Sequence, residues 1–321
     1  MSPRSTLVWF RNDLRLADHP ALWEAVERGA PVIPVFILPS PEENSASPGG
    51  AGRWWLHQSL LSLDADLRRA GSRLIVRAGD PLSVLRRLAE ECQAESIYWN
   101  RRYVAAAVAR DAEVKAEFRA RGLTIESFNG SLLYEPWQVL NQEEKPYRVF
   151  TPFWKACLAL REPGTPLPEP ARIPAPATWP ESLPGGQWRL EPKIDWAQGI
   201  RAAWTPGCEG AGQNLGVFLD EALEGYEIER DRPDRQGTSR LSPYLRFGEI
   251  SPRQIWHAAH AARQRNDVAA RDIEKFISEI YWREFSYHLL HRSPDLATKN
   301  FQPRFDRFPW RKDTKALKAW Q

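Results

Sequence analysis

The chain has 321 residues, of which 42% are hydrophobic and 26% are charged, so its composition is that of a globular protein and not of a disordered one. Its length favours two domains, and its net charge of +3 gathers near the end, where residues 292–321 hold 8 basic and 3 acidic side chains. Such a basic end suits a nucleic acid, although a solvated face is the commoner meaning of a charge run.

The cysteines and the hydropathy of the sequence indicate the cellular compartment in which the protein is expected. Cys92, Cys157 and Cys208 are far apart and odd in number, which excludes a zinc-ligand spacing and a disulfide framework. This pattern favours a reducing, cytoplasmic location. The sequence shows no signal peptide and no apolar run of transmembrane length, so we expect no membrane contact. We also expect a monomer.

The first part of the chain alternates between short apolar runs and amphipathic segments. Strands are predicted at residues 6–10, 31–38, 73–76, 96–99 and 123–128; helices at 21–28, 53–70, 81–92 and 104–121; and a loop at 39–51. This alternation implies a mostly parallel sheet covered on both faces, a Rossmann-like α/β domain over residues 1–133. No G-x-G-x-x-G follows the first strand, so a dinucleotide bound at that turn is not expected.

The remaining chain is first irregular and then helical. Residues 134–203 include a stretch dense in proline and glycine and are interpreted as a connector between domains. Residues 204–321 are interpreted as an all-α domain, with helices expected at 212–223, 241–247, 252–265 and 271–291.

Residues 237–256, GTSRLSPYLRFGEISPRQIW, form the first candidate site. Free N–H groups at a helix start, with the hydroxyls of Thr238, Ser239 and Ser242, suit a phosphate or pyrophosphate. Arg240 can add a charge-assisted hydrogen bond to the same anion. The alternative is that Thr238 and Ser239 simply cap a helix.

A second candidate lies on the long helix expected at residues 271–291. Glu279, Trp282 and Arg283 follow one another at i, i+3 and i+4, so they share a helix face. An indole can stack on a base, and an arginine can bind a phosphate. The alternative is that Trp282 belongs to the core and that Glu279 and Arg283 form a weak surface ion pair.

Several long runs, in order along nearly the whole chain, resemble the photolyase/cryptochrome family. They are GTSRLSPYLRFGEISPRQIW at residues 237–256, LVWFRNDLRLADHPAL at 7–22, RWWLHQSLLSLDADLRRAGSRL at 53–74, SFNGSLLYEPW at 127–137, YRVFTPFWKA at 147–156 and YWREFSYHLL at 281–290. The RWWL and LLYEPW runs resemble most the bacterial photolyases for cyclobutane pyrimidine dimers.

The resemblance implies FAD bound in the helical domain. Blue light would excite the reduced flavin, which would pass an electron to a pyrimidine dimer flipped out of damaged DNA; the dimer inside a duplex cannot reach a buried flavin. By motif, the residues on the phosphate and adenosine side of the cofactor would be Tyr226, Thr238, Ser239, Arg240, Leu241 and Ser242. Glu279 and Trp282 would face the dimer, and Arg283 would line the flavin side. Phe276 stands where many relatives have Trp, which weakens a stacking contact.

The resemblance also implies an antenna pigment, with methenyltetrahydrofolate expected. Residues 100–103 would lie at the carboxyl end of a strand, where a crevice forms. Val104 and Ala105 replace a Glu-Pro pair found in relatives, so no antenna residue is assigned. Trp320 resembles the outermost member of the tryptophan chain that reduces the flavin, and its inner partners are not in the sequence.

Family members continue for about 150 more residues, which is a full helical core by ordinary size rules. The FAD-binding domain is therefore expected to be incomplete. Three interpretations remain open: a truncated dimer photolyase, a cryptochrome-like photoreceptor, and a flavin-binding fragment without activity. We expect the isolated chain to bind FAD weakly or not at all and to expose apolar surface.

Overall fold

The computed structural model describes residues 4–38, 48–266 and 269–321. The loop expected at residues 39–51 lies outside the described residues as far as residue 47. Its last two residues belong to a helix that starts at Gly50, three residues earlier than predicted.

A five-stranded parallel sheet forms the centre of the first part of the chain, as predicted. Its strands lie in the order β3-β2-β1-β4-β5, and each neighbouring pair is parallel. Their bounds are Thr6–Phe10 for β1, Val32–Leu38 for β2, Ile75–Ala78 for β3, Ser96–Asn100 for β4 and Thr124–Phe128 for β5. Strand β3 begins two residues later than expected.

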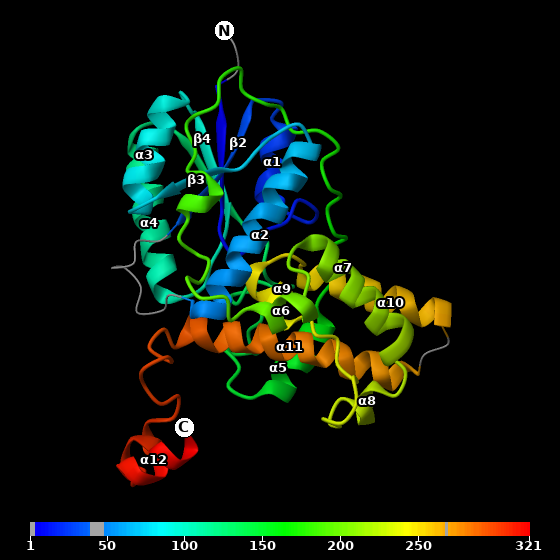
Figure 1. Ribbon diagram of the computed structural model, residues 1–321. Coiled ribbons are helices and arrows are strands. Elements are labelled where there is room, and N and C mark those ends of the chain that lie inside the picture. Colours follow the sequence, from blue (N-terminus) through cyan, green and yellow to red (C-terminus); the bar gives the residue numbers. More distant parts are fainter. Residues whose placement is uncertain (1–3, 39–47, 267–268) are drawn as a thin grey trace.

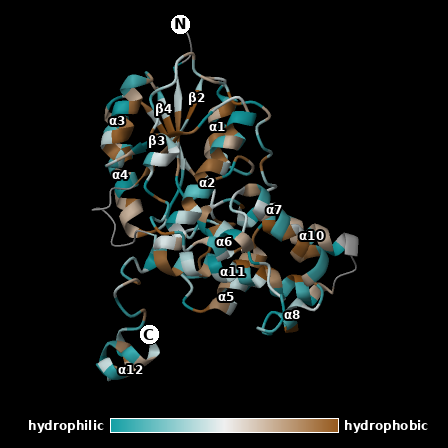
Figure 2. Cartoon of the chain, in the orientation of Figure 1, coloured by the Kyte–Doolittle hydropathy of each residue, from teal (hydrophilic) through white to brown (hydrophobic). Residues whose placement is uncertain are grey.

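Helices cover both faces of this sheet, which explains why its inner strands are apolar throughout (Figures 1 and 2). Along β1, Val8 and Phe10 belong to the same apolar cluster as helices α1 and α2, whereas Leu7 and Trp9 belong to the cluster of α3 and α4. The helices span Pro20–Glu27 (α1), Gly50–Arg69 (α2), Pro81–Glu91 (α3) and Ala105–Ala120 (α4).

Helices make up most of the second part of the chain and pack below the sheet, with α11 running along its lower end (Figure 1). The longer helices span Phe150–Ala159 (α5), Cys208–Val217 (α7), Pro252–Asn266 (α10) and Ala270–Arg292 (α11). The shorter ones span Gln198–Ala203 (α6), Tyr226–Glu229 (α8), Ser242–Phe247 (α9) and Thr314–Trp320 (α12). Short 3₁₀ turns lie at Gly185–Gln187 (η2) and Pro303–Arg307 (η4), so residues 134–203, expected as a connector, contain α5, η2 and α6.

The helix expected at residues 212–223 is instead two pieces. Helix α7 starts four residues earlier, at Cys208, and ends at Val217. A wider π-type turn, η3, then spans Phe218–Ala222. The first turn of α7 carries small and polar residues, so it lacks the apolar spacing from which a helix is predicted.

Buried Arg15 joins the two parts of the molecule. Its guanidinium donates to the carbonyls of Ala17 (3.0 Å), Asp18 (2.6 Å), Gly130 (2.6 Å) and Gly248 (3.0 Å). Gly248, at φ 70°, comes so close that a Cβ there would lie 2.2 Å from the Asn12 carbonyl oxygen. The loop after β1 therefore contacts the turn after α9 directly.

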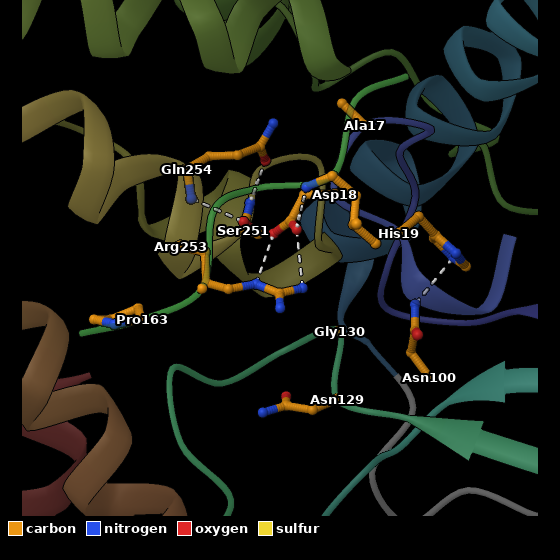
Figure 3. Close-up of polar contacts among 12 residues, drawn as sticks. Ala17, Asp18, His19, Asn100, Asn129, Gly130, Pro163, Ser251, Arg253 and Gln254 are labelled. Atoms are coloured by element: carbon orange, nitrogen blue, oxygen red, sulfur yellow. Dashed lines mark hydrogen bonds and ion pairs between the residues drawn. The ribbon is translucent and has the colours of Figure 1, made fainter. Parts of the chain in front are cut away.

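Next to Arg15, the carboxylate of Asp18 forms a two-pronged ion pair with Arg253, near the start of α10 (Figure 3). The two nitrogen–oxygen distances are 2.9 and 3.1 Å. Asp18 also accepts a hydrogen bond from the Leu167 amide at 3.1 Å, so the connector is fixed to the same point. Its side chain is fully buried, and its φ of 52° lies in the left-handed region that Asp and Asn tolerate.

The replacement Asp18→Asn should be strongly destabilising, because it leaves Arg253 without its carboxylate. Asn has nearly the same shape as Asp and tolerates the same left-handed backbone, so the loss of stability measures the contribution of the negative charge. We expect the free energy of unfolding to fall by about 3 kcal/mol in urea titrations. The control Asp195→Asn removes an exposed carboxylate paired with Arg201 and should cost less than about 0.5 kcal/mol. Equal effects of the two changes would contradict the role given to Asp18.

Candidate functional site

Three of the predicted site residues come together on α8 and α11. The rings of Tyr226 and Phe276 meet edge to face at 5.5 Å, and Phe218 lies 4.5 Å from Phe276. One turn along α11, Glu279 forms ion pairs with Arg230 and, at 3.4 Å, with Lys275. The guanidinium of Arg230 also lies over the Tyr226 ring. Tyr226 and Phe276 are buried, so both act first as packing residues.

The predicted phosphate loop, residues 237–242, is an open turn and not a capped helix start. Helix α9 has Leu241 as its N-cap and no side-chain cap hydrogen bond, so the interpretation of Thr238 and Ser239 as caps is wrong. Gly237 is required there, because a Cβ would lie 2.6 Å from the Glu229 carbonyl oxygen. The loop is thus pressed against the end of α8.

The polar side chains of this loop are exposed, apart from Ser239. Thr238 and Ser242 are exposed and Ser239 is half-buried. None of these three hydroxyls forms a hydrogen bond with another described residue. Arg240 has a φ of 54°, and its guanidinium lies 4.1 Å above the Trp204 ring and donates to the Ala203 carbonyl at 3.1 Å. Leu241 is buried and anchors the loop.

Trp282 and Arg283 turn to different neighbours from those of Glu279. The Trp282 indole stacks on Phe150 at 3.7 Å with 10° between the rings, and 44% of the residue stays exposed. Arg283 instead reaches the Ser131 carbonyl at 2.8 Å and lies 4.9 Å from the Tyr287 ring. Glu279, Trp282 and Arg283 share a helix face, as the spacing predicted, but each contacts a different part of the protein.

Trp320 lies far from this group. It is 83% exposed, near the end of α12, and its ring contacts no other aromatic ring of the described residues. The segment that carries it extends away from the body of the molecule (Figure 1). Exposed apolar side chains gather in that segment, including Phe305, Phe308, Trp310 and Leu317.

A buried carboxylate behind the phosphate loop was not predicted. Glu249 accepts hydrogen bonds from Ser59 (2.6 Å), Trp55 (3.0 Å) and the Gly207 amide (2.6 Å). It has no cation beside it, and burial raises its pKa to about 7. Glu249 thus ties α2 and the start of α7 to the turn that ends α9. Its only trace in the sequence is an acidic residue inside an apolar run.

Glu284 occupies a similar place at the other end of the contact between the two parts. Its carboxylate accepts from the Leu133 amide at 2.8 Å and from Tyr134 at 3.4 Å, and Arg283 lies 3.2 Å away. Burial raises the pKa of Glu284 to about 7 as well. Two carboxyl groups at this contact, Glu249 and Glu284, therefore have pKa values near physiological pH, whereas Asp18 forms an ion pair with Arg253.

Comparisons with known proteins agree on one family. Residues 6–172 match the family described as DNA photolyase, and residues 276–321 match the FAD binding domain of DNA photolyase. A deoxyribodipyrimidine photo-lyase of Agrobacterium fabrum is 48% identical over 98% of this chain and 65% of its own length. Cryptochrome-2 of Arabidopsis thaliana is 33% identical over 99% of this chain and 54% of its own length.

The solved structures agree with the sequences. A bacterial class III photolyase from Agrobacterium tumefaciens superposes with a TM-score of 0.94 at 46% identity, over 100% of this chain and 66% of its own. The chain thus spans between about half and two thirds of the length of these relatives. Within the described ranges, every helix is too short or too polar to span a bilayer.

Ionisation of Glu249 should make stability depend on pH. Because its pKa in the folded chain, about 7, exceeds the usual 4.5, folding favours the protonated form. Its stabilising contribution is complete below pH 4.5 and is lost as the pH rises through 7. The difference in free energy of unfolding between the natural chain and Glu249→Gln should therefore fall by about 3 kcal/mol from pH 4.5 to 8.

Urea unfolding at several pH values measures how steeply the free energy of unfolding changes with pH, which is the slope compared here. Any loss from changed hydrogen bonds in Glu249→Gln is the same at each pH and does not affect it. Glu91→Gln, at the exposed end of α3, is the control and should leave the slope unchanged. A slope in Glu249→Gln equal to that of the natural chain would show that Glu249 does not titrate as described.

Proposed function

Because this chain belongs to the photolyase/cryptochrome family, we propose that it serves light-dependent DNA repair by splitting cyclobutane pyrimidine dimers. The observation that carries the proposal is the 48% identity with a deoxyribodipyrimidine photo-lyase, which extends over 98% of the chain. This identity includes both the sheet and the helices that carry the predicted site.

The residues of loop 237–242 fit the phosphate side of FAD. The hydroxyls of Thr238, Ser239 and Ser242 have no hydrogen-bond partner among the described residues, and the guanidinium of Arg240 belongs to the same loop. Such groups bind phosphate oxygens well. When bound, reduced FAD supplies an electron after it absorbs light. The chain's own residues position the cofactor, and the buried Tyr226–Phe276 pair supports that wall.

The exposed indole of Trp282 fits a flipped-out base. Its stacking on Phe150 fixes the ring plane, so a base meets a flat and preorganised surface. Glu279 can accept hydrogen bonds from a base edge only if it is held in place, and its pairs with Arg230 and Lys275 do this. These contacts support damaged DNA as the partner.

A cryptochrome-like photoreceptor is the second candidate. The 33% identity with a plant cryptochrome, over nearly the same residues, favours it. One measurement distinguishes the two functions: whether the amount of pyrimidine dimer falls on illumination. A folate antenna remains a further prediction, and Asn100, Arg101 and Tyr103 are already bonded within the protein.

The cofactor assignment predicts the effect of two hydroxyls. In the double variant Thr238→Val/Ser242→Ala, the affinity for FAD should fall about a hundredfold, because each hydrogen bond to a charged oxygen contributes about 1.5 kcal/mol. Quenching of flavin fluorescence measures the affinity. Thr298→Val, which removes an exposed hydroxyl near the end of α11, should leave it unchanged. An unaltered affinity in the double variant would place the phosphates elsewhere.

The repair assignment predicts the effect of the stacking indole. The chain loaded with reduced FAD is illuminated with an oligonucleotide that contains one thymine dimer, and dimer loss is measured by chromatography. Trp282→Ala should weaken oligonucleotide binding about tenfold, since base stacking contributes about 1–3 kcal/mol. Trp196→Ala, which removes another exposed indole, is the control. Bound flavin with unchanged dimer content would contradict repair and would fit either a photoreceptor or a flavin-binding fragment without activity.

A further inference from the structure

Helix α8 carries Tyr226 but is too short to hold its own position. It spans Tyr226–Glu229, and its N-cap is Gly225, which has no side chain to bond the first amides. Isolated helices shorter than about 12 residues are marginal in water, so a single turn depends on its neighbours. The amides at its start also lack partners within the helix. The contacts that fix α8 therefore come from other elements.

Asp272 of α11 supplies the contact at the start of α8. Its carboxylate accepts hydrogen bonds from the amides of Gly225 and Glu227, each at 3.0 Å. These amides stand on either side of Tyr226, so one carboxylate holds the backbone around that residue. Asp272 is 2% exposed, and no described lysine, arginine or histidine forms an ion pair with it. The two amides therefore offset the loss of water around this carboxylate.

The place of Asp272 in the sequence indicates a different role. It stands in the first turn of α11, where an acidic residue commonly serves the free amides of its own helix. However, α11 has Ala269 as its N-cap and no side-chain cap hydrogen bond. The Asp272 carboxylate instead reaches across to α8, which lies beside the start of α11 (Figure 1).

The end of α8 in turn sets the start of loop 237–242. Gly237 approaches so closely that a Cβ there would lie 2.6 Å from the Glu229 carbonyl oxygen. Glu229 also forms an ion pair at 3.0 Å with Arg235, in the turn that leads to Gly237. A displacement of α8 would therefore move both Tyr226 and the loop.

A second polar contact between α8 and α11 is more accessible to water. Arg230, which follows α8, forms an ion pair with Glu279, and both side chains are partly exposed. Such pairs contribute little to stability. The hydrogen bonds of Asp272 are buried, and breaking them would leave their donors and acceptors without water. Of the two polar contacts, Asp272 therefore restrains α8 more strongly.

We propose that Asp272 is a positioning residue of the flavin site, which holds α8 so that Tyr226 and loop 237–242 keep their relative positions on the phosphate and adenosine side of FAD. This inference rests on the proposed FAD site. Asp272 acts on the cofactor only through α8. Its contribution to affinity is the fraction of molecules in which the two elements stand ready to bind.

The variant Asp272→Asn tests the proposal, because Asn has one acceptor oxygen and turns an NH₂ group toward one of the two amides. We expect the affinities for FAD and for ADP, which carries the same pyrophosphate and adenosine, to fall equally, by about tenfold, as the competent arrangement becomes about a tenth populated. Flavin fluorescence measures FAD, and competition measures ADP. Riboflavin lacks both groups, so its affinity should not change. The control Asp220→Asn, an exposed carboxylate in η3, should leave all three affinities unchanged.

Hydrogen exchange separates this inference from the cofactor assignment, because it needs no cofactor. Measured by mass spectrometry, exchange at residues 225–230 should become about tenfold faster in Asp272→Asn, while exchange in β1 stays as slow as in the natural chain. Failure of the natural chain to bind FAD and ADP would contradict the cofactor assignment, and the faster exchange would still confirm that Asp272 holds α8. Unchanged exchange in α8, unchanged affinity for FAD, or an equal loss of riboflavin affinity would each overturn the role of Asp272.

Discussion

The buried guanidinium of Arg15 holds the α/β part and the helical part in one arrangement. Its four hydrogen bonds all go to backbone carbonyls, and these belong to the loop after β1, to Gly130 and to Gly248. Burial lowers the pKa of Arg15, and the nearby charge of Arg253 lowers it further, although Asp18 and Asp13 raise it. A charge so placed tolerates few displacements of its partners, because each unpaired donor or acceptor would be left without water. The neighbouring pair of Asp18 and Arg253 extends this constraint to the connector and to α10.

The rest of the seam between the two parts is held by hydrogen bonds to carboxyl groups. Glu249 receives three donors and has no cation beside it, and Glu284 receives two backbone amides. Such groups lose less on burial when they are protonated, which is why their pKa values rise. The contact between the two parts thus depends on hydrogen bonds to buried carboxyl groups as well as on ion pairs.

Helix α11 brings several surfaces together along one side. Glu279 faces Arg230 near Tyr226, Trp282 lies on Phe150, and Arg283 reaches across to Ser131. A long helix can present neighbouring residues to different elements because long side chains diverge from a common face. The contacts of Glu279, Trp282 and Arg283 are therefore fixed relative to one another by the same rigid element.

Much of this arrangement could be predicted from the sequence. Residues 6–10 and 31–38 are apolar without alternation, which indicates strands buried on both faces, and the sheet confirmed them. The family could be recognised because long runs such as residues 237–256 match over their whole length. The helix at residues 271–291 was predicted to within one residue at each end, because its apolar period extends over six turns.

Other features depended on the tertiary structure, for a physical reason. The groups that bond to Arg15 and Glu249 come from distant parts of the chain, and local periodicity contains no information about such contacts. The sequence allowed Thr238 and Ser239 as caps or as ligands, and the structure excluded the cap because α9 follows Leu241 and has no side-chain cap hydrogen bond. The sequence by itself determined the elements, the family and the residue types available for chemistry. The packing of the two parts decided which of the described charges found partners, such as Asp18 with Arg253.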